Sequence, residues 1–206
     1  MDQGRAAQVH ADNADAAAHV LTAALVDDPT FVHVLPRESL RHDALRAFYG
    51  FAIRDALQFG RVLAERDDAG LAAVAIWYPP GRYPMTTRRK LGAIPAMLGL
   101  LLRSPARILA LERLGAAADA AFPAQDASSI EAMGVRPDAQ GRGHGRRLMD
   151  RIIKESERTQ VGCYLATVTA NVPFYEEMGF CVLRDVDGAR NGAPTGVRML
   201  RVPQSA

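Results

Sequence analysis

Hydrophobic residues follow two different spacings in the first third of the chain. Residues 7–11 alternate between hydrophobic and polar, which predicts a short strand that ends near Asn13. Residues 14–26 instead carry hydrophobic side chains three and four positions apart, as one face of an amphipathic helix does. A second helical pattern runs over about 36–59. The sequence thus predicts a strand followed by two helices.

The stretch RVLAERDDAGLAAVAIWYPPG predicts a β-hairpin. Two runs of strand-forming residues, at 61–66 and 71–78, flank the turn sequence DDAG, and PPG ends the second run. Residues 86–121 then have the pattern of two or three helices, broken around Pro95 and at the sequence SPAR, 104–107. We interpret this segment as a helical insert that separates the hairpin from the next strand.

Short strands and helices alternate in the second half of the chain. The predicted strands cover 130–135, 163–168, 180–186 and 195–202. The predicted helices cover 145–159 and 172–178, and a turn covers 187–194. Because the order lacks strict β-α-β alternation, the sequence predicts an α/β fold whose sheet has antiparallel and parallel parts. We find no repeats and expect one domain that spans 1–206.

The composition narrows the class of protein. With 49% hydrophobic and 23% charged residues, the chain is typical of a globular domain rather than a disordered one. A formal net charge of +2 argues against a broad nucleic-acid-binding surface, so we expect no nucleic-acid partner. The most apolar stretch, 91–102, is too short to span a bilayer and contains Pro95. We therefore expect no membrane partner, with a shallow interfacial contact as the weaker alternative.

Cysteines and histidines bear on localisation and metal binding. Cys163 and Cys181 are the only cysteines, too few for a disulfide framework or a metal site, and we interpret both as buried thiols in the reducing cytoplasm. The five histidines lack ligand spacing with acids or cysteines, so we predict no metal. The first 20 residues contain Asp2 and no apolar core, which is not the pattern of a secretory signal.

The sequence QGRGHGRR, 140–147, places glycines and basic residues at the start of a predicted helix. A helix N-terminus presents unpaired backbone N–H groups and a partial positive charge, which acidic side chains normally balance. Here Arg142, His144, Arg146 and Arg147 stand there instead, and the glycines between them remove Cβ atoms that would hold a phosphate away from the amides. The pattern predicts a phosphate-binding turn, although its spacing matches neither a P-loop nor a Rossmann turn. The alternative is a loop whose arginines point into solvent.

Two segments resemble the signatures of one enzyme family. MGVRPDAQGRGHGRRLM resembles the acetyl-CoA-binding signature of the GCN5-related N-acetyltransferases (GNAT), with Gln140, Gly143 and Gly145 at the motif positions. NVPFYEEMGF resembles the second signature of that family, in which Asn171 and Tyr175 precede a Gly-Phe pair. VAIWYPPG and DDPTFVHVLP look like the branch of the family that includes puromycin N-acetyltransferase.

The resemblance implies a fold, a co-substrate and the residues that bind it. The fold is a twisted, mostly antiparallel sheet flanked by helices, in which two parallel strands splay apart to admit the pantetheine arm of acetyl-CoA. Backbone groups of Met133, Gly134 and Val135 are expected to pair with that arm, and Asn171 to contact it near the thioester. The pyrophosphate is expected beside Gln140, at the backbone N–H groups of Gly141, Arg142, Gly143, His144, Gly145 and Arg146.

Acetyl transfer to an amine needs an acid, a base and a donor to the oxyanion. By the resemblance, Tyr175 is expected to protonate the departing CoA thiolate; the alternative is a tyrosine that only packs in the core. Glu131 is expected to accept the proton of the amine through water; the alternative is a surface or ion-paired glutamate. Strand alternation predicts Ile130 and Ala132 on one face and Glu131 on the other, and we expect the Val135 N–H to stabilise the oxyanion.

The acceptor side departs from the puromycin-acetyltransferase branch. Residues 127–129 read ASS where that branch often has aromatic residues or histidine, and Ala166 stands where a Glu commonly precedes the Thr of the next strand. These departures put the acceptor in question. We expect the helical insert, 86–121, to wall the acceptor site together with the second predicted helix, 36–59. The methionines and leucines of the insert either line an adaptable apolar surface or simply form core.

The expected function is acetyl-CoA-dependent transfer of an acetyl group to a primary amine of a small molecule, with antibiotics and other natural products as one class of acceptor. Two alternatives stay open. The protein acetylates a protein N-terminus or lysine, or it is a CoA-binding regulatory module without catalysis. Both a monomer and a homodimer are compatible with the sequence.

Overall fold

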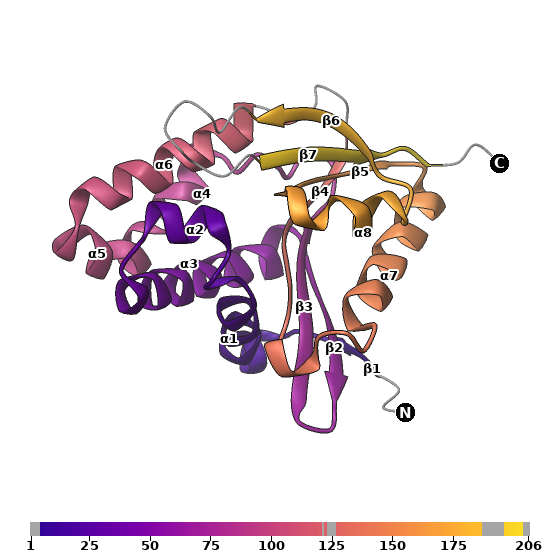
Figure 1. The fold of residues 1–206 in the computed structure, drawn as a ribbon, viewed down its shortest axis with the longest axis horizontal. Coiled ribbons are helices and arrows are strands. Elements are labelled where there is room, and N and C mark those ends of the chain that lie inside the picture. The colour runs from indigo at the N-terminus through magenta and orange to yellow at the C-terminus, as the bar shows by residue number, and fades with distance from the viewer. Residues whose placement is uncertain (1–4, 121, 123–126, 187–195, 204–206) are drawn as a thin grey trace.

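A seven-stranded mixed sheet with the order β1-β2-β3-β4-β5-β7-β6 forms the centre of the molecule (Figure 1). The computed structural model describes residues 5–120, 122, 127–186 and 196–203. The strands are β1 (Arg5–Gln8), β2 (Arg61–Asp67), β3 (Gly70–Tyr78), β4 (Ala127–Val135), β5 (Gly162–Val168), β6 (Cys181–Val186) and β7 (Gly196–Arg201). Among these described strands only β4 and β5 pair in parallel. The predicted mixed, mostly antiparallel sheet is confirmed.

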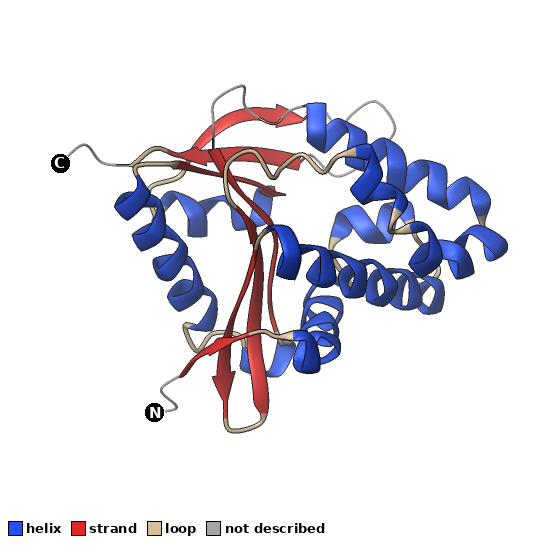
Figure 2. Ribbon diagram, turned by 180° about the vertical axis from the view of Figure 1, so that it is seen from behind, coloured by secondary structure: helices blue, strands red, loops and turns tan. Residues whose placement is uncertain are grey.

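Helices cover both faces of this sheet (Figures 1 and 2). They are α1 (Ala14–Leu25), α2 (Pro29–Val34), α3 (Glu38–Phe59), α4 (Thr87–Leu91), α5 (Ile94–Arg103), α6 (Pro105–Ala120), α7 (His144–Thr159) and α8 (Val172–Glu176). On one face α1 and α3 bury Leu21 and Ile53 against the sheet. On the other face Leu148 and Ile152, four residues apart on α7, are completely buried. The amphipathic pattern that predicted α7 is therefore confirmed.

The insert consists of three helices, as the breaks in the sequence predicted. Gly92 and Ala93 separate α4 from α5, and Ser104 separates α5 from α6. Pro95 lies in the first turn of α5, where its missing N–H costs no helical hydrogen bond. Met97 packs with the buried residues under the insert, so the interpretation of this methionine as core is the better one.

Two elements near the N-terminus differ from the prediction. β1 ends at Gln8 rather than near Asn13, because 11–13 form a 3-10 turn in which the Asn13 side chain accepts from the His10 N–H at 2.8 Å. Helix α2 was not predicted. Asp28 caps it by accepting from the Thr30 N–H at 2.8 Å, with a proline at the first helical position. The sequence DDP ends one helix and also begins another.

Strand β4 begins three residues earlier than predicted. Ala-Ser-Ser has little strand preference by itself, but Ser128 and Ser129 are buried between neighbouring strands, and the Ser128 hydroxyl donates to the Gly162 carbonyl at 3.0 Å. Tertiary pairing thus extends the strand. The predicted turn at 187–194 lies outside the described residues.

The parallel strands β4 and β5 separate part-way along their length. Their pairing runs from Ala127 opposite Gly162 to Ile130 opposite Leu165. Beyond that point β4 continues beside β3 as far as Val135, while β5 continues beside β7. The expected splayed pair is present, and the gap begins after Ile130.

Other described features bear on thiols, metals and membranes. Cys163 is buried, but Cys181 is exposed on the edge strand β6, so the prediction of two buried thiols is wrong for Cys181. The described residues contain no group of three or more His, Cys, Asp or Glu that could hold a metal ion. In the same part of the chain, no helix combines the length and hydrophobicity that crossing a bilayer requires.

Candidate active site

A β-bulge lies where β4 leaves β5. Ala132 pairs with Ile76 and Ile130 with Trp77 on β3, so Glu131 between them has no partner. Ile130 packs in the cluster under α7, whereas Ala132 packs against the cluster under α1 and α3. The prediction that Ile130 and Ala132 share a face is wrong, because the extra residue interrupts the two-residue alternation.

Two backbone positions of β4 face the gap. The Arg136 N–H donates to the Ala72 carbonyl at 2.8 Å, and in an antiparallel ladder such bonded pairs alternate with pairs whose polar groups point away from the partner strand. The register then directs the N–H and C=O groups of Met133 and Val135 away from β3, toward the side that β5 has left. Gly134 falls at a bonded position, so its backbone groups face β3.

Gly134 lets helix α1 approach the sheet closely. A Cβ atom at this position would lie 2.7 Å from the Cβ of Ala24 and 3.3 Å from a methyl group of Leu21. Any larger residue would push α1 away from β4. The glycine therefore supports the gap through packing.

The turn between β4 and α7 contains two left-handed glycines. Gly141 has φ +74° and Gly143 φ +77°, a conformation that other residues adopt at a cost. Gly143 caps α7, whose first helical bond joins the Arg147 N–H and the Gly143 carbonyl at 3.0 Å. The N–H groups before Arg147 have no intrahelical acceptor. Among the described residues, no atom lies within 4 Å of a Cβ placed on Gly141, so an anion approaching there meets backbone.

Gln140 and Gly145 hold this turn against β4. The Gln140 side chain donates from Nε2 to the Val135 carbonyl at 3.2 Å. Gly145 lies so close that a Cβ would come within 3.3 Å of Val135 Cγ2. The turn and the gap-facing end of β4 thus form one continuous backbone surface.

Two of the four basic side chains at the turn point inward. Arg147 Nε donates to Glu65 Oε2 at 3.1 Å, and Arg147 Nη2 lies 2.8 Å from His144 Nδ1. His144 and Glu65 are almost fully buried, at 1% and 2% exposure. Arg151 also donates to Glu65, at 3.4 Å, so the buried carboxylate anchors α7 to β2. The sequence analysis missed Glu65, because nothing around it marks a partner 82 residues further along the chain.

Arg142 and Arg146 keep their charges at the solvent-facing side of the turn. Arg146 Nη1 lies 3.3 Å from Glu177 Oε2, and both side chains are mostly exposed, so the pair is weak. Arg142 is exposed as well. The outward charge at the turn is therefore smaller than the sequence alone indicates.

Tyr175 lies on the α7 side of the sheet with its ring 7% exposed. The ring packs edge-on against Phe174 and Phe180, with centroids 5.1 and 5.8 Å apart. Burial, followed by the charge of Cys163, raises the pKa of Tyr175 to about 12, while a hydrogen bond with Thr167 opposes the rise. Thr167 belongs to β5 beyond its pairing with β4, so the phenol lies beside the gap with its proton held at neutral pH.

Known proteins share this arrangement. The family model described as the acetyltransferase (GNAT) domain matches residues 105–182, which include β4, the glycine turn, α7, β5 and α8. Residues 105–182 thus match the GNAT family of acetyltransferases.

Solved GNAT-fold structures resemble nearly the whole chain. An acetyltransferase of Corynebacterium glutamicum, related to histone acetyltransferase HPA2, has a TM-score of 0.70 at 18% identity, with 100% of this chain and 99% of that chain covered. A ribosomal-protein-S18-alanine N-acetyltransferase of Escherichia coli has a TM-score of 0.56 at 16% identity, with 99% of this chain and 97% of that chain covered. The PaiA N-acetyltransferase of Thermoplasma acidophilum, in complex with coenzyme A, has a TM-score of 0.58 at 11% identity, with 97% of this chain and 99% of that chain covered. At these identities the likeness shows a shared fold.

Asn171, from the second GNAT signature, lies just beyond β5. It ends the 3-10 turn Thr169–Asn171 and precedes α8. The residue is exposed, and its side chain does not cap the helix. Its amide therefore stands at the end of the gap where β5 has already separated from β4.

Glu131 lies near charged groups of α3 and of the helical insert. Its side chain is half-buried, with part of its surface still reaching solvent. Burial raises the pKa of Glu131 to about 7; the charges of Asp119 and Asp55 add to the rise, and those of Lys90 and Arg89 oppose it. A carboxyl group that titrates near neutral pH is suited to accept a proton there.

A buried ion pair ties the insert to the GNAT core near Glu131. Arg89 Nε donates to Asp55 Oδ1 at 3.0 Å, and the Tyr78 hydroxyl donates to Asp55 Oδ2 at 2.7 Å. The guanidinium lies over the rings of Phe59 and Tyr78, at 4.6 and 5.1 Å from their centroids. The sequence analysis missed this cluster, because its members come from three separate elements and form no motif.

Aromatic rings continue from this cluster to β5. Tyr78 stacks on Tyr83 with centroids 6.4 Å apart, Tyr83 meets Phe122 at 5.1 Å, and Phe122 meets Tyr164 at 5.1 Å. Burial, then the charges of Glu131 and Asp119, raise the pKa of Tyr83. Aromatic rings and carboxylates thus lie together near the start of β5.

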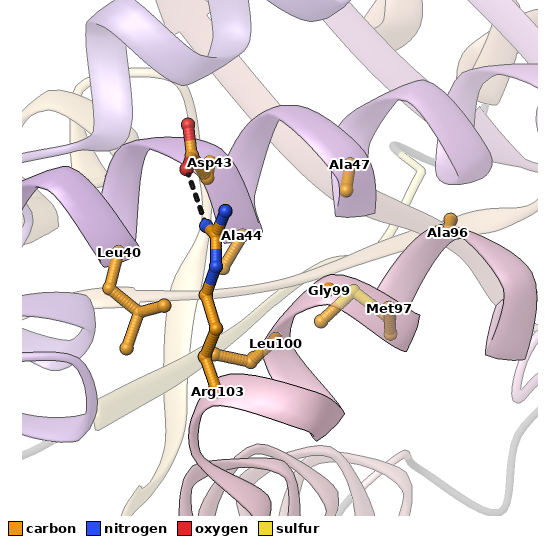
Figure 3. Close-up of a pocket in the computed structure, with 9 residues that line it drawn as sticks. All are labelled: Leu40, Asp43, Ala44, Ala47, Ala96, Met97, Gly99, Leu100 and Arg103. Carbon is orange, nitrogen blue, oxygen red and sulfur yellow. Dashed lines mark hydrogen bonds and ion pairs between the residues drawn. The ribbon is translucent and has the colours of Figure 1, made fainter.

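A separate pocket lies between α3 and α5 (Figure 3). Its walls include Leu40, Met97 and Leu100, and the ion pair between Asp43 and Arg103, 3.0 Å long, crosses its rim. None of the predicted site residues lines it. It is a packing hollow between the insert and α3 rather than a part of the gap.

Proposed function

We propose that the protein transfers the acetyl group of acetyl-CoA to a primary amine of a small molecule, by direct attack in a ternary complex. One observation carries the proposal: the gap between β4 and β5 opens onto backbone groups of β4 that are not bonded to β3, and it leads to a glycine turn at the start of α7. The whole chain would serve as one acetyltransferase domain.

The donor site follows from this backbone surface. Met133 and Val135 would bind the pantetheine amides as an added strand does, since their polar groups face the gap. The N–H groups of 141–146 would hold the pyrophosphate at the N-terminus of α7, where the helix dipole favours negative charge. Arg142 and Arg146 stand beside it, and Asn171 would contact the arm near the thioester.

The residues around the gap supply the three parts of acetyl transfer. Glu131 would take a proton from the acceptor ammonium, through water, so that the neutral amine attacks the thioester carbonyl. The Val135 N–H would stabilise the oxyanion. Tyr175 would give its proton to the sulfur as the C–S bond breaks. The nitrogen would lose its second proton, which would return to the Tyr175 phenolate through water, leaving the acetylated amine and coenzyme A.

The insert supports a small acceptor. Tyr83 and Phe122 form a half-buried aromatic wall over the buried Tyr164, and the carboxyl groups of Asp119 and Glu131 lie near Tyr83. An amine with an apolar body fits this combination of walls better than an extended peptide does. Amine antibiotics and other amine-bearing natural products are therefore the first acceptors to test.

The experiment is a screen with acetyl-CoA, in which thiol release and product mass are followed for amines, amine antibiotics, and peptides with free N-termini or lysines. We expect thiol release with at least one small amine and a matching acetylated product. Acetylation of peptides alone would overturn the small-molecule acceptor. Coenzyme A binding without any thiol release would instead identify a regulatory module.

A further inference from the structure

One side-chain amine of the protein lies on the acceptor side of the gap. The chain has only two lysines, Lys90 and Lys154, against 23 arginines. Lys90, on α4, forms an ion pair with Asp119 of α6, and its side chain remains 40% exposed. Lys154 lies on α7 and is exposed on the far side of the sheet. The two lysines therefore differ in position but share the same chemistry.

Packing connects the Lys90–Asp119 pair to the start of the gap. The Phe122 N–H donates to the Asp119 carbonyl at 3.1 Å, and the Phe122 ring packs on Tyr164 of β5. Tyr164 lies opposite Ser129 on β4, one position before the parallel pairing ends. The pair is thus held beside the last bonded residues of the splayed strands.

The carboxyl groups of Glu131 and Asp119 lie close enough to influence the same neighbouring groups. Both carboxylates raise the pKa of Tyr83 after burial does, and the charges of Asp119 and Lys90 both act on Glu131. An ammonium group beside Asp119 therefore has a proton acceptor nearby.

We infer that Lys90 is a self-acetylation site: without an external acceptor, its amine takes the acetyl group of the acetyl-CoA bound in the same chain. The inference rests on the proposed use of acetyl-CoA. Lys90 gives one proton to Glu131 through water, and its nitrogen then attacks the thioester carbonyl. The N–C bond forms and gives a tetrahedral oxyanion, and the C–S bond then breaks while Tyr175 protonates the leaving thiolate. The nitrogen loses its second proton, which returns to the Tyr175 phenolate through water. The products are Nε-acetyl-Lys90 and free coenzyme A.

The test incubates the full chain with acetyl-CoA alone and follows the intact mass, with fragmentation to locate the acetyl group. We expect one acetyl group on Lys90, at least about tenfold ahead of Lys154, because the Lys90–Asp119 pair packs toward the start of the gap whereas Lys154 lies on α7. Lys90→Arg should abolish the modification while keeping a cation beside Asp119. Lys154→Arg should leave it unchanged. Equal labelling of both lysines would overturn the inference, since that is the pattern of uncatalysed acetylation.

Two further measurements make the outcome decisive. The first-order rate should not depend on protein concentration; a rate that rises with concentration would mean that one copy modifies another. Tyr175→Phe should slow the labelling by about 10²-fold or more if the catalytic acid takes part. Calorimetry on the same preparation separates the two proposals. Bound coenzyme A with unmodified Lys90 overturns self-acetylation alone, whereas absence of binding overturns the proposed function as well.

Discussion

The two sides of the gap between β4 and β5 are built differently. On the donor side, the groups proposed to bind acetyl-CoA are mostly backbone amides and glycines within one short stretch, 133–146. On the proposed acceptor side, side chains from α3, α4, α6 and β4 meet through long-range ion pairs and ring contacts. A site made of local backbone keeps its geometry when distant residues change. A site assembled from distant side chains changes with each of them, so acceptor choice can vary while donor binding is retained.

The largest effect on turnover should come from the residue proposed as the catalytic acid, Tyr175. Tyr175→Phe removes the proton that the leaving thiolate needs, and we expect turnover to fall by about 10²–10⁴-fold. Coenzyme A affinity, measured by calorimetry, should stay within about twofold of the wild-type value. The substitution removes only the hydroxyl group, so the ring still packs against Phe174 and Phe180. Turnover close to that of the wild type would remove Tyr175 from the mechanism.

Glu131→Gln tests the acceptor side by pH. Because the pKa of Glu131 is about 7, its carboxylate becomes available as pH rises through 7, so the wild-type rate should increase over that range. In the variant we expect a rate about 10²-fold lower and no rise near pH 7, with donor affinity unchanged. An unaltered acidic limb in the variant would contradict the base assignment.

The same variant has a stability signature. A carboxyl group whose folded pKa is raised from 4.5 to about 7 contributes stability that is present below pH 4.5 and lost as pH rises through 7. In thermal unfolding experiments, the wild type should therefore lose more stability between about pH 5 and pH 8 than Glu131→Gln does, because this range includes the folded pKa. Parallel curves for the two proteins would contradict the raised pKa.

Arg89→Met tests whether the buried ion pair holds the acceptor side together. The change leaves Asp55 buried without its charged partner, which typically costs about 3–5 kcal/mol, and we expect the lower end in a chemical unfolding experiment because Tyr78 still donates to Asp55. Its neighbour provides a matched control: Arg88 is exposed, so Arg88→Met should change stability by less than about 0.5 kcal/mol. Equal effects of the two substitutions would show that the pair contributes nothing specific.

Gly143→Ala tests the donor side and should have the smallest effect. Holding a residue other than glycine at φ +77° costs about 1–2 kcal/mol of folding free energy. The Cβ atom of the alanine would also lie 3.2 Å from Arg147 Nη1. Distortion of the turn should weaken coenzyme A binding by about tenfold in calorimetry. Gly115→Ala, in an open position on α6, should leave binding unchanged. Unchanged affinity in Gly143→Ala would separate the turn from the pyrophosphate.

The same contrast explains what the sequence could reveal. Glycines, a helix start and strand patterns act over a few residues, so the glycine turn, α7 and the places of the strands along the chain were predictable. The bulge at Glu131 was not, because it results from how β4 pairs with β3. Glu65 and the Asp55–Arg89 pair were missed for a related reason: each is an ordinary charged residue until folding brings its partner to it.

The most direct test of the account is amide hydrogen exchange, resolved by residue, with and without saturating coenzyme A. We predict that the amides of Met133, Val135 and the turn at 141–146 become protected on binding, while that of Gly134, already bonded to β3, changes little. Binding of coenzyme A with unchanged exchange at all of these amides would contradict the account.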